Sequence, residues 1–254
     1  MSDESITRAA DLLRGGGLVA FPTETVYGLG SDACNAAAVA SIFAAKGRPA
    51  FNPLISHVAS ASEAFALGIE TPAARRLADA FWPGPMTLIL QRAPNCPIAS
   101  LTSAGLDRIA LRVPAHEGAR RLLQQFSGPV AAPSANPSGR ISPSRAAHVM
   151  AGLGKAIDMV LDGGPCSSGV ESTVVDTSGT QAVILRPGGV TRDAIKRCLA
   201  AGGLSLMPAT QDGPGKDRPV SPGQLESHYA PHARLKMNVT AIEDDMELIG
   251  FGPI

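Results

Sequence analysis

The corner Lys46-Gly47-Arg48-Pro49 carries two cations separated by one glycine, directly after an Ala-rich segment and shortly before Asn52. Cations in this position can simply balance the negative end of a helix dipole. However, the proline after Arg48 restricts the exit of the chain and favours both side chains on one side of the turn. A point charge from Lys and a planar fork from Arg suit a polyphosphate. The corner therefore predicts a polyphosphate site, with the helix-end interpretation left open.

Two further segments are rich in small hydrogen-bond donors. APSANPSG (residues 132–139), followed by Ser142-Pro143, offers hydroxyl, amide and backbone N–H groups after a buried strand, although such a segment is often only a turn. DGGPCSSGVEST (residues 162–173) has the small residues that allow backbone nests to bind anions, or it is merely a flexible loop. Strand ends of open α/β sheets are common ligand sites, which favours the binding interpretation of both segments.

Two common nucleotide motifs are not supported. The P-loop pattern G-x-x-x-x-G-K-[ST] does not occur. Residues 28–33 match G-x-G-x-x-A, but the sequence has no Asp or Glu from Ala33 to Ser62, where a dinucleotide fold needs an acidic residue for the ribose. A Rossmann site is therefore rejected.

Predicted helices and strands, which must position these residues, alternate along the chain. Helical patterns start near Ser2 or Asp3 and at Ala36, and others lie at residues 73–81, 117–126 and 144–150. Short apolar runs predict strands at residues 18–21, 54–58, 87–90, 109–113, 130–132, 159–161, 173–175 and 183–185. Short hairpin-like spacings mixed with longer crossovers predict an α+β (α/β-like) domain on a large mixed sheet.

Composition limits the class of ligand. The 22 Lys and Arg residues equal the 22 Asp and Glu residues, whereas a protein that holds polynucleotide by charge alone normally has a basic excess. A small-molecule site is favoured, and no stable nucleic-acid binding is expected. The four scattered cysteines lack zinc spacing, and no run of 18 apolar residues or basic leader occurs, so we expect a cytoplasmic protein with reduced thiols and no membrane segment.

Residues 207–235 form a segment rich in Pro and Gly, and residues 246–251 have the pattern of one strand. A passive tether is the simple interpretation of the first segment. Against it, His228-Tyr229-Ala230-Pro231 supplies an imidazole and an aromatic ring that a spacer does not need. We expect His228 and Tyr229 to form a lid over the site.

The motifs FPTETVYGLG, KGRP with NPL, PGPMTLIL, APSANPSG, GVESTVVD and ILRPG occur in the order found in the YrdC-like family. SPGQLESHYAPH (residues 221–232) resembles the linker of the longer, two-domain form of that family. The resemblance implies a YrdC-like fold with a large twisted mixed sheet flanked by helices. It also implies a catalytic domain at residues 1–206, a linker at 207–235 that folds back on the active site, and the remnant or start of a small α/β domain at 236–254.

The resemblance further implies an activity. Family members join L-threonine, bicarbonate (or CO2) and ATP with Mg2+ into threonylcarbamoyl-adenylate, releasing pyrophosphate, and a tRNA-modifying transferase complex uses the product. This chemistry is mostly positioning and charge neutralisation, which fits cations without an obvious nucleophile. A non-catalytic nucleotide- or RNA-binding regulatory paralogue on the same fold stays open as the alternative.

Site residues follow from matching motif positions, and no side chain is assigned to a metal. The resemblance implies catalytic roles for Lys46 and Arg48. His57 could instead be a packed core residue, but the match favours contact with threonine. The implied ATP-binding residues are Lys46, Arg48, Asn52, Ser134, Asn136, Ser142, Arg186 and Tyr229, and the implied threonine-binding residues are Thr25, Tyr27, His57, Arg112 and Ser172.

Overall fold

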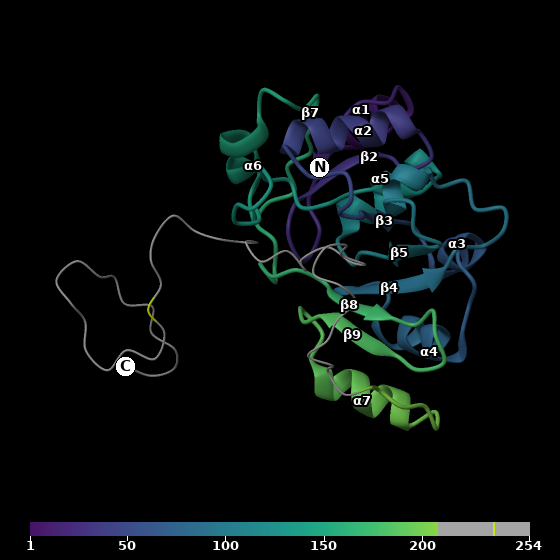
Figure 1. Ribbon diagram of the computed structural model, residues 1–254. Helices are drawn as coiled ribbons and strands as arrows, with labels where there is room; N and C mark the ends of the chain where they lie inside the picture. The colour runs from purple at the N-terminus through teal and green to yellow at the C-terminus, as the bar shows by residue number, and fades with distance from the viewer. Residues whose placement is uncertain (208–235, 237–254) are drawn as a thin grey trace, which may run out of the picture.

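The computed structural model describes residues 1–207 and residue 236, and within that part nine strands form one mixed sheet (Figure 1). Their order is β7-β1-β2-β6-β3-β5-β4-β8-β9. Parallel pairing joins β1 to β7, β3 to β5 and β4 to β8, and the other neighbours are antiparallel. The strands are β1 (Val19–Phe21), β2 (Gly28–Asp32), β3 (Ile55–His57), β4 (Met86–Gln91), β5 (Arg108–Arg112), β6 (Val130–Ala131), β7 (Met159–Val160), β8 (Thr173–Asp176) and β9 (Val183–Arg186). The predicted α+β fold on a mixed sheet is confirmed.

The helices begin and end where the sequence supplies capping groups. The Asn35 side chain accepts hydrogen bonds from the N–H groups of Ala37 and Ala38, and the second helix ends at Gly47 in the left-handed conformation (φ +58°). The helices are α1 (Asp3–Arg14), α2 (Ala36–Lys46), α3 (Ala61–Leu67), α4 (Pro72–Phe81), α5 (Glu117–Phe126), α6 (Ala146–Leu153) and α7 (Arg192–Ala200), with one 3-10 turn at Ser100–Ser103.

The two faces of the sheet are covered differently. On one face, α2, α3, α4, α6 and α7 pack over the main core, which includes Leu29, Leu88 and Leu111. On the other face, α1 and α5 cover only the part that contains Val19, Phe21 and Val130. The rest of that second face carries a separate, small cluster of buried apolar residues, Ile55, Ile89, Ala110 and Val174. His57 and Arg112 lie on this second face, two residues beyond Ile55 and Ala110 on their strands.

The glycines of residues 28–33 belong to a strand. A Cβ atom at Gly30 would lie 2.8 Å from Phe21 Cε1 and 2.9 Å from Val130 Cγ1, so this position on β2 has room only for glycine. The segment pairs with β1 and β6. This arrangement confirms that G-x-G-x-x-A is not a dinucleotide-binding turn here, and it adds a strand that the apolar runs did not predict.

Two helices were also not predicted, α3 and α7. The first has a reciprocal cap, in which Ser60 Oγ accepts from the Glu63 N–H and Glu63 Oε2 accepts from the Ala59 N–H. Thr191 caps α7 by accepting from the Ala194 N–H. None of the helices between residues 1 and 207 has the length and apolar character that a bilayer span requires. The linker, the strand predicted at residues 246–251, His228 and Tyr229 lie outside the described residues.

Candidate active site

A cavity on the second sheet face brings most of the motifs together. It is lined by residues from the β1–β2 connection, β3, β5, the segment after β6, the segment before β8, and β9. Seven of the predicted site residues line it: Thr25, Arg48, His57, Arg112, Ser134, Ser172 and Arg186. Three of them are guanidinium groups, and Glu171 is the one carboxylate among the lining residues. The cavity therefore has an excess of positive charge and many hydroxyl groups.

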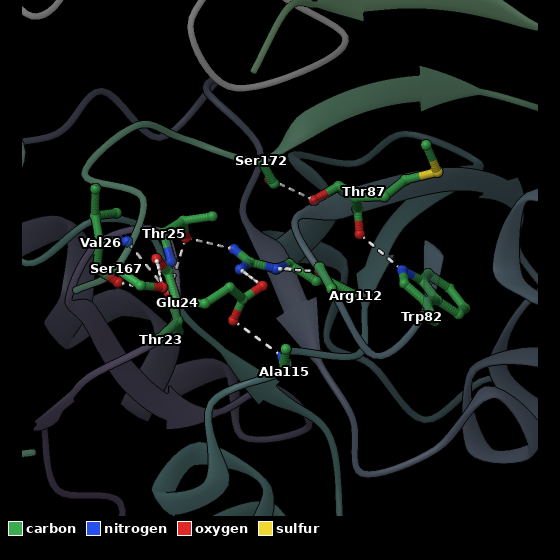
Figure 2. A network of polar contacts seen from close by, with 12 residues as sticks. Thr23, Glu24, Thr25, Val26, Trp82, Thr87, Arg112, Ala115, Ser167 and Ser172 are labelled. Atoms are coloured by element: carbon green, nitrogen blue, oxygen red, sulfur yellow. Dashed lines mark hydrogen bonds and ion pairs between the residues drawn. The ribbon is translucent and has the colours of Figure 1, made fainter. Parts of the chain in front are cut away.

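Arg112 is held on three sides at the end of β5. Its Nε donates to the carbonyl oxygen of Gly84 (3.3 Å), one terminal nitrogen donates to Thr25 Oγ1 (2.9 Å), and the other donates to Glu24 Oε1 (2.6 Å; Figure 2). Thr25 is itself fixed, because Thr23 Oγ1 accepts from its N–H in a tight turn. Burial lowers the pKa of Arg112, and the neighbouring Glu24 opposes that shift. The guanidinium is thus oriented before any ligand arrives.

Arg186 and Ser172 form a second fixed group. The Arg186 guanidinium donates to the Ser172 carbonyl oxygen (2.8 Å) and to Ser172 Oγ (3.1 Å). Ser172 Oγ also lies 2.7 Å from Thr87 Oγ1 on β4 (Figure 2). Because β8 starts directly after Ser172, the pairing of β4, β8 and β9 sets the position of both residues.

His57 contributes a neutral imidazole. It lies beside Arg112 in the register of β3 and β5 and meets the edge of the Phe21 ring, with 6.0 Å between the ring centroids. Burial, and then the charge of Arg112, lowers the pKa of His57 to about 3. Its Nδ1 is buried and has no hydrogen-bond partner among the described residues. A polar atom of this kind in a cavity wall is suited to a ligand contact.

Lys46 and Arg48 do not point together into the cavity, although their spacing predicted one side of the turn. Lys46 Nζ donates to the carbonyl oxygens of Ser134 (2.5 Å) and Asn136, and its carbonyl accepts from the Ser138 N–H. Arg48 donates to the carbonyl oxygens of Asn52 and Pro53 and does line the cavity. Lys46 thus fastens the end of α2 to the loop after β6. Burial, and then the charge of Arg48, lowers the pKa of Lys46 to about 7.

Four other predicted residues are not among the residues that line the cavity. Both polar side-chain atoms of Asn52, and Oδ1 of Asn136, are buried without a partner among the described residues. Ser142 Oγ donates to Glu171 Oε1 (2.5 Å). Tyr27 is fully buried in the main core, where its hydroxyl donates to the Gly164 carbonyl (2.7 Å) and accepts from the Gly163 N–H. Burial raises the pKa of Tyr27 to about 12, so its hydroxyl stays neutral. The neutral hydroxyl holds the loop at residues 162–164 through these hydrogen bonds.

Two carboxylates of the region were missed as site residues. Glu171 lines the cavity, and Glu24 lies beneath it against Arg112. Both stand inside motifs that were recognised, but their partners lie 29 and 88 residues away in sequence, so spacing alone does not reveal their contacts. Among the described residues, no group of three or more His, Cys, Asp or Glu is arranged to hold a metal ion.

Comparison with known proteins finds matches in sequence and in fold. The model of the Sua5/YciO/YrdC family, described as telomere recombination, matches residues 11–188. The chain is 46% identical over 228 residues to the threonylcarbamoyl-AMP synthase of Pyrococcus abyssi, covering 89% of this chain, and 44% identical over 235 residues to that of Bacillus subtilis, covering 92%. It spans 66% of the length of each relative. The crystal structure of P. abyssi Sua5 complexed with L-threonine superposes with a TM-score of 0.84 at 45% identity, covering 92% of this chain and 67% of that one.

Proposed function

Because this chain belongs to the Sua5/YciO/YrdC family, we propose that it is a threonylcarbamoyl-AMP synthase, a nucleotidyltransferase that joins L-threonine, bicarbonate or CO2, and ATP. The observation that carries the proposal is the cavity itself. Arg48, Arg112 and Arg186 all line it, together with hydroxyl residues such as Thr25, Ser134 and Ser172. ATP and bicarbonate are anionic and threonine carries a carboxylate, so one cavity with an excess of guanidinium groups suits them.

We assign two sets of lining residues to different substrates. The oriented guanidinium of Arg112, with Thr25, His57 and Ser172, fits the carboxylate and hydroxyl of threonine. Arg48 and Ser134, with the loop that Lys46 fastens to the end of α2, fit the phosphates of ATP. The P. abyssi relative is complexed with L-threonine in its crystal structure, which supports the first assignment. His228 and Tyr229 remain proposed lid residues, and Tyr229 remains a proposed ATP contact.

The reaction needs positioning more than a nucleophile on the protein. The threonine amine adds to CO2, forming a C–N bond and losing a proton, and the carbamate oxygen then attacks the α-phosphorus of ATP while pyrophosphate leaves. Fixed guanidinium groups neutralise the charge that builds up on the phosphates. His57 is neutral near pH 7 because its pKa is about 3, so it orients a substrate and takes no proton.

Mg2+ would accompany ATP. With Glu171 as the one carboxylate lining the cavity, and no cluster of metal ligands among the described residues, the donor set fits an ion held mainly by phosphate oxygens and water. When bound there, Mg2+ supplies further neutralisation of phosphate charge. We further propose that the protein acts in the cytoplasm and passes its product to a tRNA-modifying transferase complex.

The test is pyrophosphate release by the full chain in the presence of ATP, L-threonine and bicarbonate. Release should depend on all three substrates and should fall at least about 100-fold in Arg48→Ala, since a charged donor to the phosphates is lost. Arg75→Ala is the matched control, because Arg75 is exposed and pairs with Glu70 far from the cavity. Nucleotide binding without pyrophosphate release would instead favour the regulatory alternative.

A further inference from the structure

Glu24 is a largely buried carboxylate that pairs with a cavity-lining arginine but does not itself line the cavity. Its side chain is 14% exposed and forms an ion pair with Arg112, whose side chain is 4% exposed. We propose that Glu24 is a positioning residue for the carboxylate of the amino-acid substrate, acting by holding the Arg112 guanidinium in its binding orientation. This inference rests on the proposed function, since it assumes that Arg112 receives that carboxylate.

The hydrogen bonds of Arg112 leave a defined part of the guanidinium for a ligand. A guanidinium has five N–H donors, one on Nε and two on each terminal nitrogen. Gly84, Thr25 and Glu24 each take one of them, on three different nitrogens. Within the described chain, one N–H on each terminal nitrogen therefore stays without an acceptor. Two such donors match the two oxygens of a carboxylate.

Glu24 cannot move toward the ligand, because every oxygen it carries is engaged. Oε1 accepts from Arg112, and Oε2 accepts from the Ala115 N–H just before α5 (2.9 Å; Figure 2). Its main-chain oxygen accepts from the Ser168 N–H (2.8 Å). Glu24 is thus fixed to the start of α5 and to the loop that leads to Ser172. A carboxylate held at both oxygens restrains the guanidinium and keeps its remaining donors aimed at the cavity.

The charge of Glu24 has a second consequence for Arg112. Arg112 is buried, and Arg186 is a like charge close enough to disfavour its protonated form. Without Glu24 the guanidinium would lose its one ion-pair partner in the described chain and would be free to turn. Glutamine at position 24 would keep the side-chain volume. Its amide has only one acceptor oxygen, whereas the Arg112 guanidinium and the Ala115 N–H each donate to a different oxygen of Glu24.

A double-mutant cycle separates positioning from a general structural role. Calorimetry would measure L-threonine and ATP binding to the full chain and to Glu24→Ala, Arg112→Lys and the double variant. Glu24→Ala should weaken threonine binding about 10-fold or more, because an oriented charged hydrogen bond is lost. In the Arg112→Lys background the same change should cost less than about 2-fold, because a lysine has no fork to orient. ATP binding should change less than about 2-fold in Glu24→Ala.

Asp176→Ala is the matched control. Asp176 pairs with Arg108 (2.8 Å) at the opposite end of β5, so this variant also removes the carboxylate partner of an arginine on that strand. It should leave threonine binding unchanged. If Glu24→Ala does not fold, as judged by circular dichroism, Glu24→Gln replaces it with a smaller expected loss.

The outcomes distinguish this inference from the proposed function. Wild-type chain that binds no threonine overturns the proposed function and the role of Glu24 together. Wild-type chain that binds threonine, with an unchanged affinity in Glu24→Ala, overturns the role of Glu24 alone. Equal losses in the wild-type and Arg112→Lys backgrounds, or an equal loss of ATP affinity, would show that Glu24 supports the fold and does not position Arg112.

Discussion

If the phosphates of ATP bind beside Lys46, binding should be accompanied by proton uptake. The Lys46 side chain is buried, and burial followed by the charge of Arg48 lowers its pKa to about 7. At pH 8, about 0.9 of the free protein therefore has a neutral lysine. A phosphate nearby favours the charged form and raises the pKa again, so nearly all of the complex is protonated. The expected uptake is about 0.8 to 0.9 proton per ATP at pH 8 and about 0.1 at pH 6.

The same shift sets how nucleotide affinity depends on pH. Because the protonated form of Lys46 binds ATP better, ATP affinity is greatest below pH 7. It falls as the pH rises through the pKa that Lys46 has in the protein without ATP. If the pKa in the complex is about 9, affinity should fall roughly 25-fold between pH 7 and pH 9. If it returns to about 10.5, the fall should be roughly 50-fold.

The assay is calorimetric titration with a non-hydrolysable ATP analogue in two buffers that differ in ionisation enthalpy. Lys46→Arg keeps a charge that does not titrate in this range, and Lys46→Met removes it, so both should abolish the uptake. Lys155→Met is the control, because Lys155 is exposed and should leave the uptake unchanged. An uptake below about 0.2 proton at pH 8, or the wild-type uptake in Lys46→Arg, would refute the reasoning.

Three more predictions follow from other parts of the chain. L-Threonine should be preferred over L-serine by roughly 10- to 200-fold in kcat/KM, since one buried methyl group contributes about 1–3 kcal/mol; equal values would contradict the assignment of Thr25 and His57 to the substrate. Gly188→Ala should destabilise the fold by about 1–3 kcal/mol, because its Cβ would lie 2.6 Å from the Thr173 backbone nitrogen. Gly179→Ala, with no atom within 4 Å of its Cβ, is the control, and equal melting temperatures would disprove the crowding. Truncation after Met207 should lower the adenylate yield and raise its hydrolysis if His228 and Tyr229 shield the site; an unchanged yield would show that the linker is only a tether.

The sequence predicted most of the strands because their apolar runs match the burial of the sheet. β4 and β5 are nearly continuous buried runs, and their predicted bounds differ from the observed ones by one residue at each end. β2 was not predicted because its glycines resemble a turn. Gly30 is required there because the Phe21 and Val130 side chains on the neighbouring strands leave no room for a Cβ atom. That requirement is a tertiary contact, and no local pattern contains it.

The site residues show the same limit at the level of side chains. The motifs predicted residues that the fold brings together, since Arg48, Arg112, Ser134 and Arg186 line one cavity. They could not show that Tyr27 is turned into the main core, or that Lys46 is turned to the carbonyl oxygens of residues 134 and 136. The direction of a side chain depends on which partners the fold brings near it, and those partners lie about 90 to 140 residues away in sequence.

Carbonyl and hydroxyl oxygens hold the cations around the cavity as much as carboxylates do. Burying a guanidinium or ammonium group costs free energy unless it is hydrogen-bonded or paired. Lys46 and Arg48 donate to backbone carbonyl oxygens, and Arg186 donates to the carbonyl and hydroxyl oxygens of Ser172. Such neutral acceptors satisfy N–H donors without cancelling the positive charge, whereas the carboxylate of Glu24 both orients Arg112 and offsets part of its charge. The cavity wall therefore has fixed hydrogen-bond donors and more guanidinium groups than carboxylates, since Glu171 is its one lining carboxylate. An anionic ligand would neutralise this excess of positive charge.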